Sequence, residues 1–182
     1  MGWFRKSAPS EPLAVTIAGV KLGDRLLVVG LSEPALIAAL AIKSGLTGEA
    51  RAIDPNAERV EKGRVAIERE GALVDVTCAP WGLWPFDAES VDVTAIINLL
   101  PKLPEDACAR VIGETLRVLR PGGRAIVIEP ARRGGIGALL HRDTADSTYR
   151  GPVAALKSNG FVAVRQLAEA GGTMYVEGIK KA

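Results

Sequence analysis

Short apolar runs and longer amphipathic stretches alternate along most of the chain. Five runs rich in Val, Ile, Leu and Ala have the length and flanking residues of buried strands, and they cover 24–30, 49–55, 73–79, 91–100 and 124–130. Between them, apolar residues recur at helical spacing in 34–45, 56–71 and 104–120. This alternation predicts a mostly parallel sheet with helices on both faces.

Proline, glycine and asparagine residues mark the ends of these elements. Pro34 is suited to begin the first long helix and Gly45 to end it, while Asn56 is suited to cap the next helix. Pro121-Gly122-Gly123 predicts a sharp turn between the helix 104–120 and the strand that follows it.

The C-terminal part of the chain ends in a hairpin pattern. A short helix is expected over 151–160, and two strands, 161–169 and 173–181, are joined by a glycine pair. We therefore expect an α/β fold: a Rossmann-like, doubly wound sheet of about seven strands, mostly parallel, with an antiparallel C-terminal hairpin strand and helices on both faces.

The pattern indicates one domain over 1–182, because no repeat, low-complexity tract or second unit interrupts it. The first residues, 1–20, are expected to form a tail and one helix ahead of the first strand. The glycine-rich segment 131–150 is expected to form a short loop, or lid, after the fifth strand.

Composition narrows the classes of function. Hydrophobic residues make up 48% of the 182 residues and aromatic residues only 4%, so the core is mainly aliphatic. The net charge of +2 argues against a nucleic-acid-binding polycation. Two cysteines and one histidine provide neither a disulfide framework nor a metal site, so we expect no metal and a cytoplasmic location. No apolar run approaches the ~20 residues of a membrane-spanning helix.

Three motifs resemble those of class I S-adenosylmethionine-dependent methyltransferases, and the likeness extends from Leu13 to the C-terminus. The first is "LLVVG…AIDP", a strand and loop followed by an acid that ends the second strand. The second, "WPFDAESVDVTAIINLLPKLPED", leads into the fourth strand, and the third, "TLRVLRPGGRAIVIEP", covers a helix, a turn and the fifth strand. The resemblance implies the fold predicted above and S-adenosylmethionine as the cofactor.

Candidate binding residues lie at the carboxyl ends of the strands, where open α/β sheets bind ligands. Asp54 follows Gly30 by 54 − 30 = 24 residues, a spacing suited to binding ribose hydroxyls; alternatively, Asp54 only ends a strand before Pro55. Gly30 lets the backbone approach a ligand, or forms a simple turn. Asn98 ends the fourth strand, where it orients a substrate group or serves as a turn residue.

The loop after the first strand departs from the family's pattern, an acid followed by Gly-x-Gly-x-Gly. Aligned on Gly30, the acid position holds Val28, and the later glycine positions hold Ser32 and Pro34. These changes fall in the part of the site that the resemblance assigns to the methionine group. Ser32 is expected either to cap the following helix or to contact the ligand.

The resemblance implies a cofactor site built from several strand ends: Gly30, Leu31, Ser32, Asp54, Pro55, Ala79, Trp81 and Asn98. Pro80 stands where relatives often carry an acid for the adenine amino group, and Trp81 either stacks on the adenine or anchors its loop. No motif defines the catalytic residues. Asn98 and His141 are the candidates, the second as a base or as a surface residue of a loop.

Three functions remain open. The first is S-adenosylmethionine-dependent methyl transfer to a small-molecule acceptor. The second is a catalytically silent methyltransferase-like domain that serves as an interaction or structural subunit, which the altered loop favours. The third, a nicotinamide-dependent enzyme, lacks the expected G-x-G-x-x-G at the first turn. The short segment 131–150 leaves room for a homo-oligomer or a partner protein to complete the site, and we expect no nucleic-acid partner.

Overall fold

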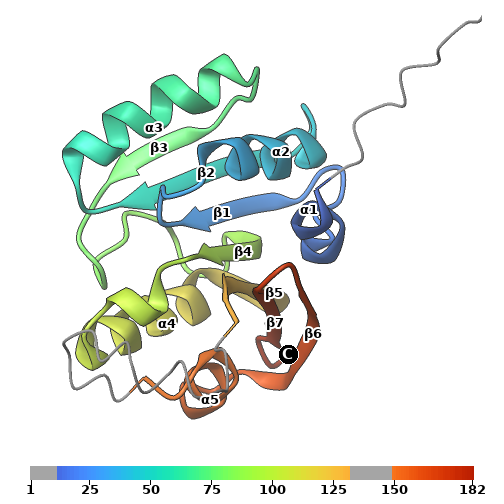
Figure 1. Cartoon of the computed structure of the whole chain (residues 1–182), viewed down its shortest axis with the longest axis vertical. Helices are drawn as coiled ribbons and strands as arrows, with labels where there is room; N and C mark the ends of the chain where they lie inside the picture. Colours follow the sequence, from blue (N-terminus) through green and yellow to red (C-terminus); the bar gives the residue numbers. More distant parts are fainter. Residues whose placement is uncertain (1–11, 132–148) are drawn as a thin grey trace, which may run out of the picture.

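Seven strands form one sheet in the computed structural model, which describes residues 12–131 and 149–182. The strand order is β3-β2-β1-β4-β5-β7-β6, with β1 to β5 parallel and β7 antiparallel to both of its neighbours (Figure 1). The strands are β1 (Arg25–Val29), β2 (Glu49–Asp54), β3 (Asp75–Cys78), β4 (Val91–Ile97), β5 (Leu119–Pro130), β6 (Val162–Ala170) and β7 (Thr173–Ile179). The predicted fold class is confirmed, including the final hairpin that joins the sheet.

Helices cover both faces of this sheet. They are α1 (Leu13–Ala18), α2 (Pro34–Ser44), α3 (Ala57–Arg69), α4 (Glu105–Val118) and α5 (Pro152–Ser158), with a 3-10 turn η1 (Leu100–Lys102) after β4. The first three pack on one face and the last two on the other (Figure 1). No helix of the described ranges is long and apolar enough to cross a membrane.

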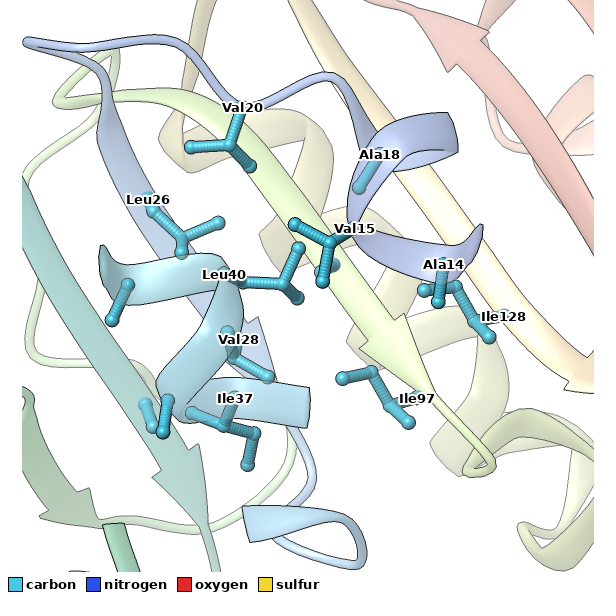
Figure 2. Close-up of a cluster of buried hydrophobic side chains, with 14 of the residues drawn as sticks. Ala14, Val15, Ala18, Val20, Leu26, Val28, Ile37, Leu40, Ile97 and Ile128 are labelled. Carbon is cyan, nitrogen blue, oxygen red and sulfur yellow. The ribbon is translucent and has the colours of Figure 1, made fainter. Parts of the chain in front are cut away.

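Strand residues alternate between two apolar layers, as the period of a β-strand requires. Leu26 and Val28 of β1 face α1 and α2, whereas Leu27 and Val29 face α4 and α5. Figure 2 shows the first layer, where Leu40 of α2 lies among side chains from α1 and the central strands. The sheet is therefore buried on both sides, and a ligand can approach it only at a strand end or an edge.

The chain reverses its direction of winding at β1. This strand pairs with β2 on one side and with β4 on the other, and the helices that follow β1 and β4 lie on opposite faces. The carboxyl ends of β1 and β4 therefore form the topological switch point, which is where sheets of this type bind ligands.

The Pro121-Gly122-Gly123 segment differs from the prediction of a sharp turn between two elements. Helix α4 ends at Val118, and β5 begins at the next residue, Leu119, so that it includes Pro121, Gly122 and Gly123. The pairing of β4 with β5 changes register here, so the segment is an irregularity within one strand. The turn itself is present, because Gly122 has a φ of +74° and an added Cβ on Gly123 would lie 2.8 Å from the carbonyl oxygen of Arg120. The backbone N–H of Gly122 also donates to the carbonyl of Lys180 (3.0 Å), so the turn lies within β5 and not ahead of it.

Candidate cofactor site

Backbone hydrogen bonds continue past the strand ends and hold the predicted site residues at one edge. The N–H of Gly30 donates to the carbonyl of Ile53 (2.9 Å), and the N–H of Ala79 donates to the carbonyl of Asp54 (3.3 Å). Asn98 likewise remains tied to the end of β5 through its own N–H. The ends of β1, β2, β3 and β4 therefore meet as predicted.

The loop that joins β1 to α2 keeps the required shape with a single glycine. Among residues 30–34, all of which the structure describes, only Gly30 has a positive φ (+90°). The side chain of Leu31 is buried and points away from the crevice, since it packs against Gly63 of α3, where an added Cβ would lie 3.4 Å from it. The absent glycines therefore cause no backbone strain, and Leu31 does not obstruct the crevice.

Ser32 links the two strands at the switch point. Its Oγ donates to the carbonyl of Ile97 (3.3 Å), and it does not cap α2, whose N-cap residue is Glu33 without a side-chain hydrogen bond. The expectation that Ser32 caps the helix is wrong because its hydroxyl is used across the crevice. Pro34 removes one N–H from the start of α2, but because no side chain caps this helix, the remaining N–H groups of its first turn suit a carboxylate.

Asp54 is almost fully buried at this edge, with 2% of its surface exposed. Its carboxylate accepts from the N–H of Asn56 (2.9 Å) and from the N–H of Leu31 (3.4 Å). The guanidinium of Arg59 binds both oxygens through Nε, at 3.0 and 3.1 Å, and forms an ion pair through Nη2 at 3.0 Å. The carboxylate thus faces the loop after β1, as ribose binding requires.

Sequence reasoning missed Arg59. The signal was present but indirect: a cation in the first turn of a helix opposes the helix dipole and therefore indicates a nearby anion. Asn56 caps α3 by accepting from the N–H of Arg59 (2.8 Å), as predicted for Asn56, so the backbone of Arg59 is fixed while its side chain lies over Asp54.

Asn98 is a turn residue, which is one of the two roles that the sequence left open. Its φ of +49° makes it a left-handed turn residue at the end of β4, a conformation that asparagine tolerates better than most residues. Its Nδ2 donates to Oε1 of Glu33 (3.2 Å), so the side chain faces the loop after β1. This pairing of Glu33 with Asn98 joins the loop after β1 to the end of β4.

The adenine side of the predicted site is formed by the segment between β3 and β4, which contains no helix within 79–90. Helix α4 holds this loop: Trp84 donates its N–H to Glu114 (3.0 Å), and Arg117 donates to the carbonyls of Trp84 (3.2 Å) and Phe86 (2.9 Å). The hydrogen bonds from Arg117 lower the pKa of Glu114. The anchored residues fix the path of the loop that carries Trp81.

Of the other predicted residues, Pro55 and Ala79 lie beside Asp54, whereas Trp81 has no hydrogen bond to it among those of the described residues. Pro55 follows it, and its carbonyl accepts from the thiol of Cys78 (3.6 Å), while Ala79 is bonded to Asp54 as described above. Trp81 is half-buried and packs with the apolar layer under α4, which supports its role as a loop anchor. His141 and most of the lid 131–150 lie outside the described residues, as does most of the tail.

A buried acid at the end of β5 was also missed. Glu129 is 1% exposed and accepts a hydrogen bond from the hydroxyl of Tyr149 (2.9 Å). Burial, and then the charge of Glu129, raises the pKa of the Cys108 thiol to about 11. Within the described residues, no group of three or more His, Cys, Asp or Glu side chains has the arrangement of a metal site.

The sheet order, the antiparallel β7 and the acid at the end of β2 define a Rossmann-like protein with a nucleoside-binding edge. Residues 27–123, just over half of the chain, match the methyltransferase domain family. The chain belongs to the class I S-adenosylmethionine-dependent methyltransferases. The matched region contains the ends of β1, β2, β3 and β4, with Gly30, Asp54, Ala79 and Asn98.

Curated relatives include two proteins named ubiquinone/menaquinone biosynthesis C-methyltransferase UbiE. The one from Chromobacterium violaceum is 30% identical over 115 residues, which are 63% of this chain and 46% of that protein. The one from Nitrosospira multiformis is 30% identical over 119 residues, 65% of this chain and 48% of that protein. The chain therefore spans about half the length of these relatives.

Solved structures share the fold at low sequence identity. A SAM-dependent methyltransferase from Aquifex aeolicus aligns with a TM-score of 0.72 at 20% identity, over 91% of this chain and 87% of that one. A SAM-dependent methyltransferase from Methanosarcina mazei aligns with a TM-score of 0.68 at 17% identity, over 91% and 97%. Family and fold together identify S-adenosylmethionine as the cofactor.

Proposed function

We propose that this protein transfers a methyl group from S-adenosylmethionine to a small-molecule acceptor. The observation that carries the proposal is the Asp54 carboxylate, which is buried at the end of β2 and bonded to the first N–H after Gly30. A carboxylate is an acceptor for both hydroxyls of a ribose. It ends the strand next to β1, beside the switch point at which such sheets bind ligands.

The other described residues fit the remaining parts of the cofactor. Gly30 gives the ligand access to the backbone, and the uncapped first turn of α2 suits the methionine carboxylate. Glu33, at the same turn, suits the methionine ammonium. It would take the role of the family's acid, whose position holds Val28 in this chain. Pro55, Ala79 and Trp81 are assigned to the adenine side.

The bound cofactor supplies an electrophilic methyl group on a sulfonium, and the protein's task is to position the acceptor in line with it. Asn98 is the described residue best placed for this, because it ends β4 beside Ser32 and Glu33. Its amide can donate to an acceptor oxygen and accept from a hydroxyl or amine. The names of the curated relatives support a small-molecule acceptor.

A second function, a catalytically silent methyltransferase-like subunit, is favoured by one specific observation. Both polar side chains that would meet the ligand already have partners within the protein: Asp54 is bonded to Arg59, and Asn98 is bonded to Glu33. A domain that no longer binds a cofactor would have reason to keep the first pair, because Arg59 satisfies the buried carboxylate of Asp54.

Calorimetric titration with S-adenosylhomocysteine separates the two functions. We expect saturable binding that weakens at least about tenfold in Asp54→Asn, because the ribose loses hydrogen bonds to a charged acceptor. Asp75→Asn is the matched control, since Asp75 is an exposed aspartate at the start of β3, at the opposite end of the sheet. An absence of binding at millimolar ligand, with wild type and Asp54→Asn alike, would support the silent subunit.

A further inference from the structure

Arg59 covers the carboxylate to which the ribose is assigned. The side chain of Asp54 is 3% exposed, whereas that of Arg59 is 55% exposed, so the guanidinium lies between the carboxylate and solvent. Two nitrogens of Arg59 contact the carboxylate: Nε donates to both oxygens of Asp54, and Nη2 lies 3.0 Å from Oδ1. Such fork-like pairs are among the stronger charge-assisted contacts in proteins.

The carboxylate has no acceptor capacity left while Arg59 is in place. An ionised carboxylate offers about four lone-pair sites. The N–H groups of Leu31 and Asn56 use two of them, and Nε and Nη2 of Arg59 use the others. Two ribose hydroxyls cannot be added to this set, so two of the present N–H donors must leave when a ribose binds through both hydroxyls.

Arg59 is the donor that can leave. The N–H groups of Leu31 and Asn56 belong to the backbone beside the strand ends, and Asn56 also caps α3. The guanidinium, in contrast, ends a long and half-exposed side chain whose backbone is held independently by the Asn56 cap. When this side chain rotates away, the half-exposed guanidinium regains water, and the ribose hydroxyls take over its hydrogen bonds to the carboxylate.

We propose that Arg59 is a latch on the ribose site: it pairs with Asp54 in the free protein and is displaced by the ribose hydroxyls of the cofactor. The inference rests on the proposed role of Asp54. It makes Arg59 a residue that sets cofactor affinity by competition, without being a catalytic residue. It also accounts for a cation in the first turn of α3, where the helix dipole disfavours one.

The test is calorimetric titration of S-adenosylhomocysteine into wild type, Arg59→Gln and the matched control Arg64→Gln. Arg64 lies on the same helix with a side chain 47% exposed, and its nearest acid is Glu61 at 3.9 Å. We expect Arg59→Gln to bind roughly threefold to tenfold more tightly than wild type, because the competing ion pair is gone. Arg64→Gln should bind like wild type.

Ionic strength provides a readout that a purely structural role of Arg59 would not give. S-adenosylhomocysteine is neutral overall at pH 7, so salt acts mainly on the latch. Raising the salt from about 0.05 M to about 0.5 M should tighten binding to wild type by weakening the ion pair, and should leave Arg59→Gln nearly unchanged. Arg59→Lys, which keeps the charge but not the fork, should lie between the two.

A double-variant cycle ties the effect to Asp54. In an Asp54→Asn background, Arg59→Gln should no longer tighten binding, because its effect passes through the carboxylate. Binding by Arg59→Gln alone, with none by wild type, would also support the latch. If wild type binds and folded Arg59→Gln binds equally or more weakly, the latch is wrong while the role of Asp54 stands. If neither protein binds, the proposed function fails and the latch fails with it.

Discussion

Gly30 is the residue on which the shape of the crevice depends most directly. Its positive φ turns the chain at the end of β1, so that the next N–H reaches Asp54 and the Leu31 side chain enters the core. The residues that replace the family's later glycines do not need this conformation. One glycine is therefore sufficient in this loop, provided that it is the first.

A Gly30→Ala variant tests this view. We expect a loss of about 1–2 kcal/mol in the free energy of unfolding, because an L-residue is strained at this φ, together with weaker binding of S-adenosylhomocysteine. Gly71→Ala is the control: its φ is +78°, but nothing lies within 4 Å of the added Cβ. Chemical denaturation should show similar losses, while calorimetry should show weaker binding only for Gly30→Ala. Unchanged binding by Gly30→Ala would contradict the role of the loop.

At the residue scale, the sequence predicted which positions meet but not how their side chains pair. Gly30, Asp54 and Asn98 followed from the ends of apolar runs, because parallel strands bring their carboxyl ends to one edge. The contacts of Arg59 and Glu33 did not follow. They depend on side-chain rotation and on the exact approach of α3 to β2, which no periodicity in the sequence specifies.

The central strands are also joined by ion pairs at their amino ends, opposite the candidate site. Asp92, at the start of β4, accepts from the backbone N–H of Arg25 (2.8 Å) and from its guanidinium (3.0 and 3.2 Å) on β1. It also accepts from Arg120 on β5. The hydrogen bonds from Arg25 hold the pKa of Asp92 well below its usual range. This carboxylate therefore joins three neighbouring strands.

An Asp92→Asn variant should lose about 1–2 kcal/mol of stability at pH 7, because two arginines lose a charged partner that is largely buried. A depressed pKa in the folded state means that this stabilisation is complete above the ordinary value of 3.8 and is lost as the pH falls below it. The stability difference between variant and wild type should therefore begin to shrink below about pH 4 and continue to shrink down to about pH 2 and below.

The matched control is Asp106→Asn, which breaks a fully exposed pair with Arg110 on α4. Exposed helix pairs contribute little, so its stability should stay close to that of wild type across the same pH range. A constant difference between Asp92→Asn and wild type at every pH would show that the ion pair is not the source of the stability.

At the element scale, strand and helix order was predictable, whereas one boundary was not. Apolar runs located every strand, and Pro34, Gly45 and Asn56 ended or capped helices as predicted. The fifth strand begins at Leu119 and not at the predicted residue 124, because turn-forming residues such as Pro121-Gly122-Gly123 also occur in irregular strands. Only the pairing of this segment with β4 and β7 distinguishes the two, and that pairing is a long-range property.

For the whole molecule, the two ends of the sheet have different tasks. The amino end is crossed by the Asp92 ion pairs, whereas the carboxyl end gathers polar groups whose partners are side chains able to rotate. Figure 1 shows how β1 and β4, side by side in the sheet, lead into helices on opposite faces. A site at the carboxyl ends of β1 and β4 can therefore bind and release a ligand without breaking the ion pairs of Asp92 at the amino end.

The most direct test of this account is a crystal structure of the protein with S-adenosylhomocysteine. We predict the ligand at the carboxyl ends of β1, β2 and β4, with its ribose hydroxyls bonded to Asp54, the guanidinium of Arg59 turned away, and the methionine group at the first turn of α2. A ligand bound elsewhere, or a ribose that does not contact Asp54, would contradict the central claim that this carboxylate holds the cofactor.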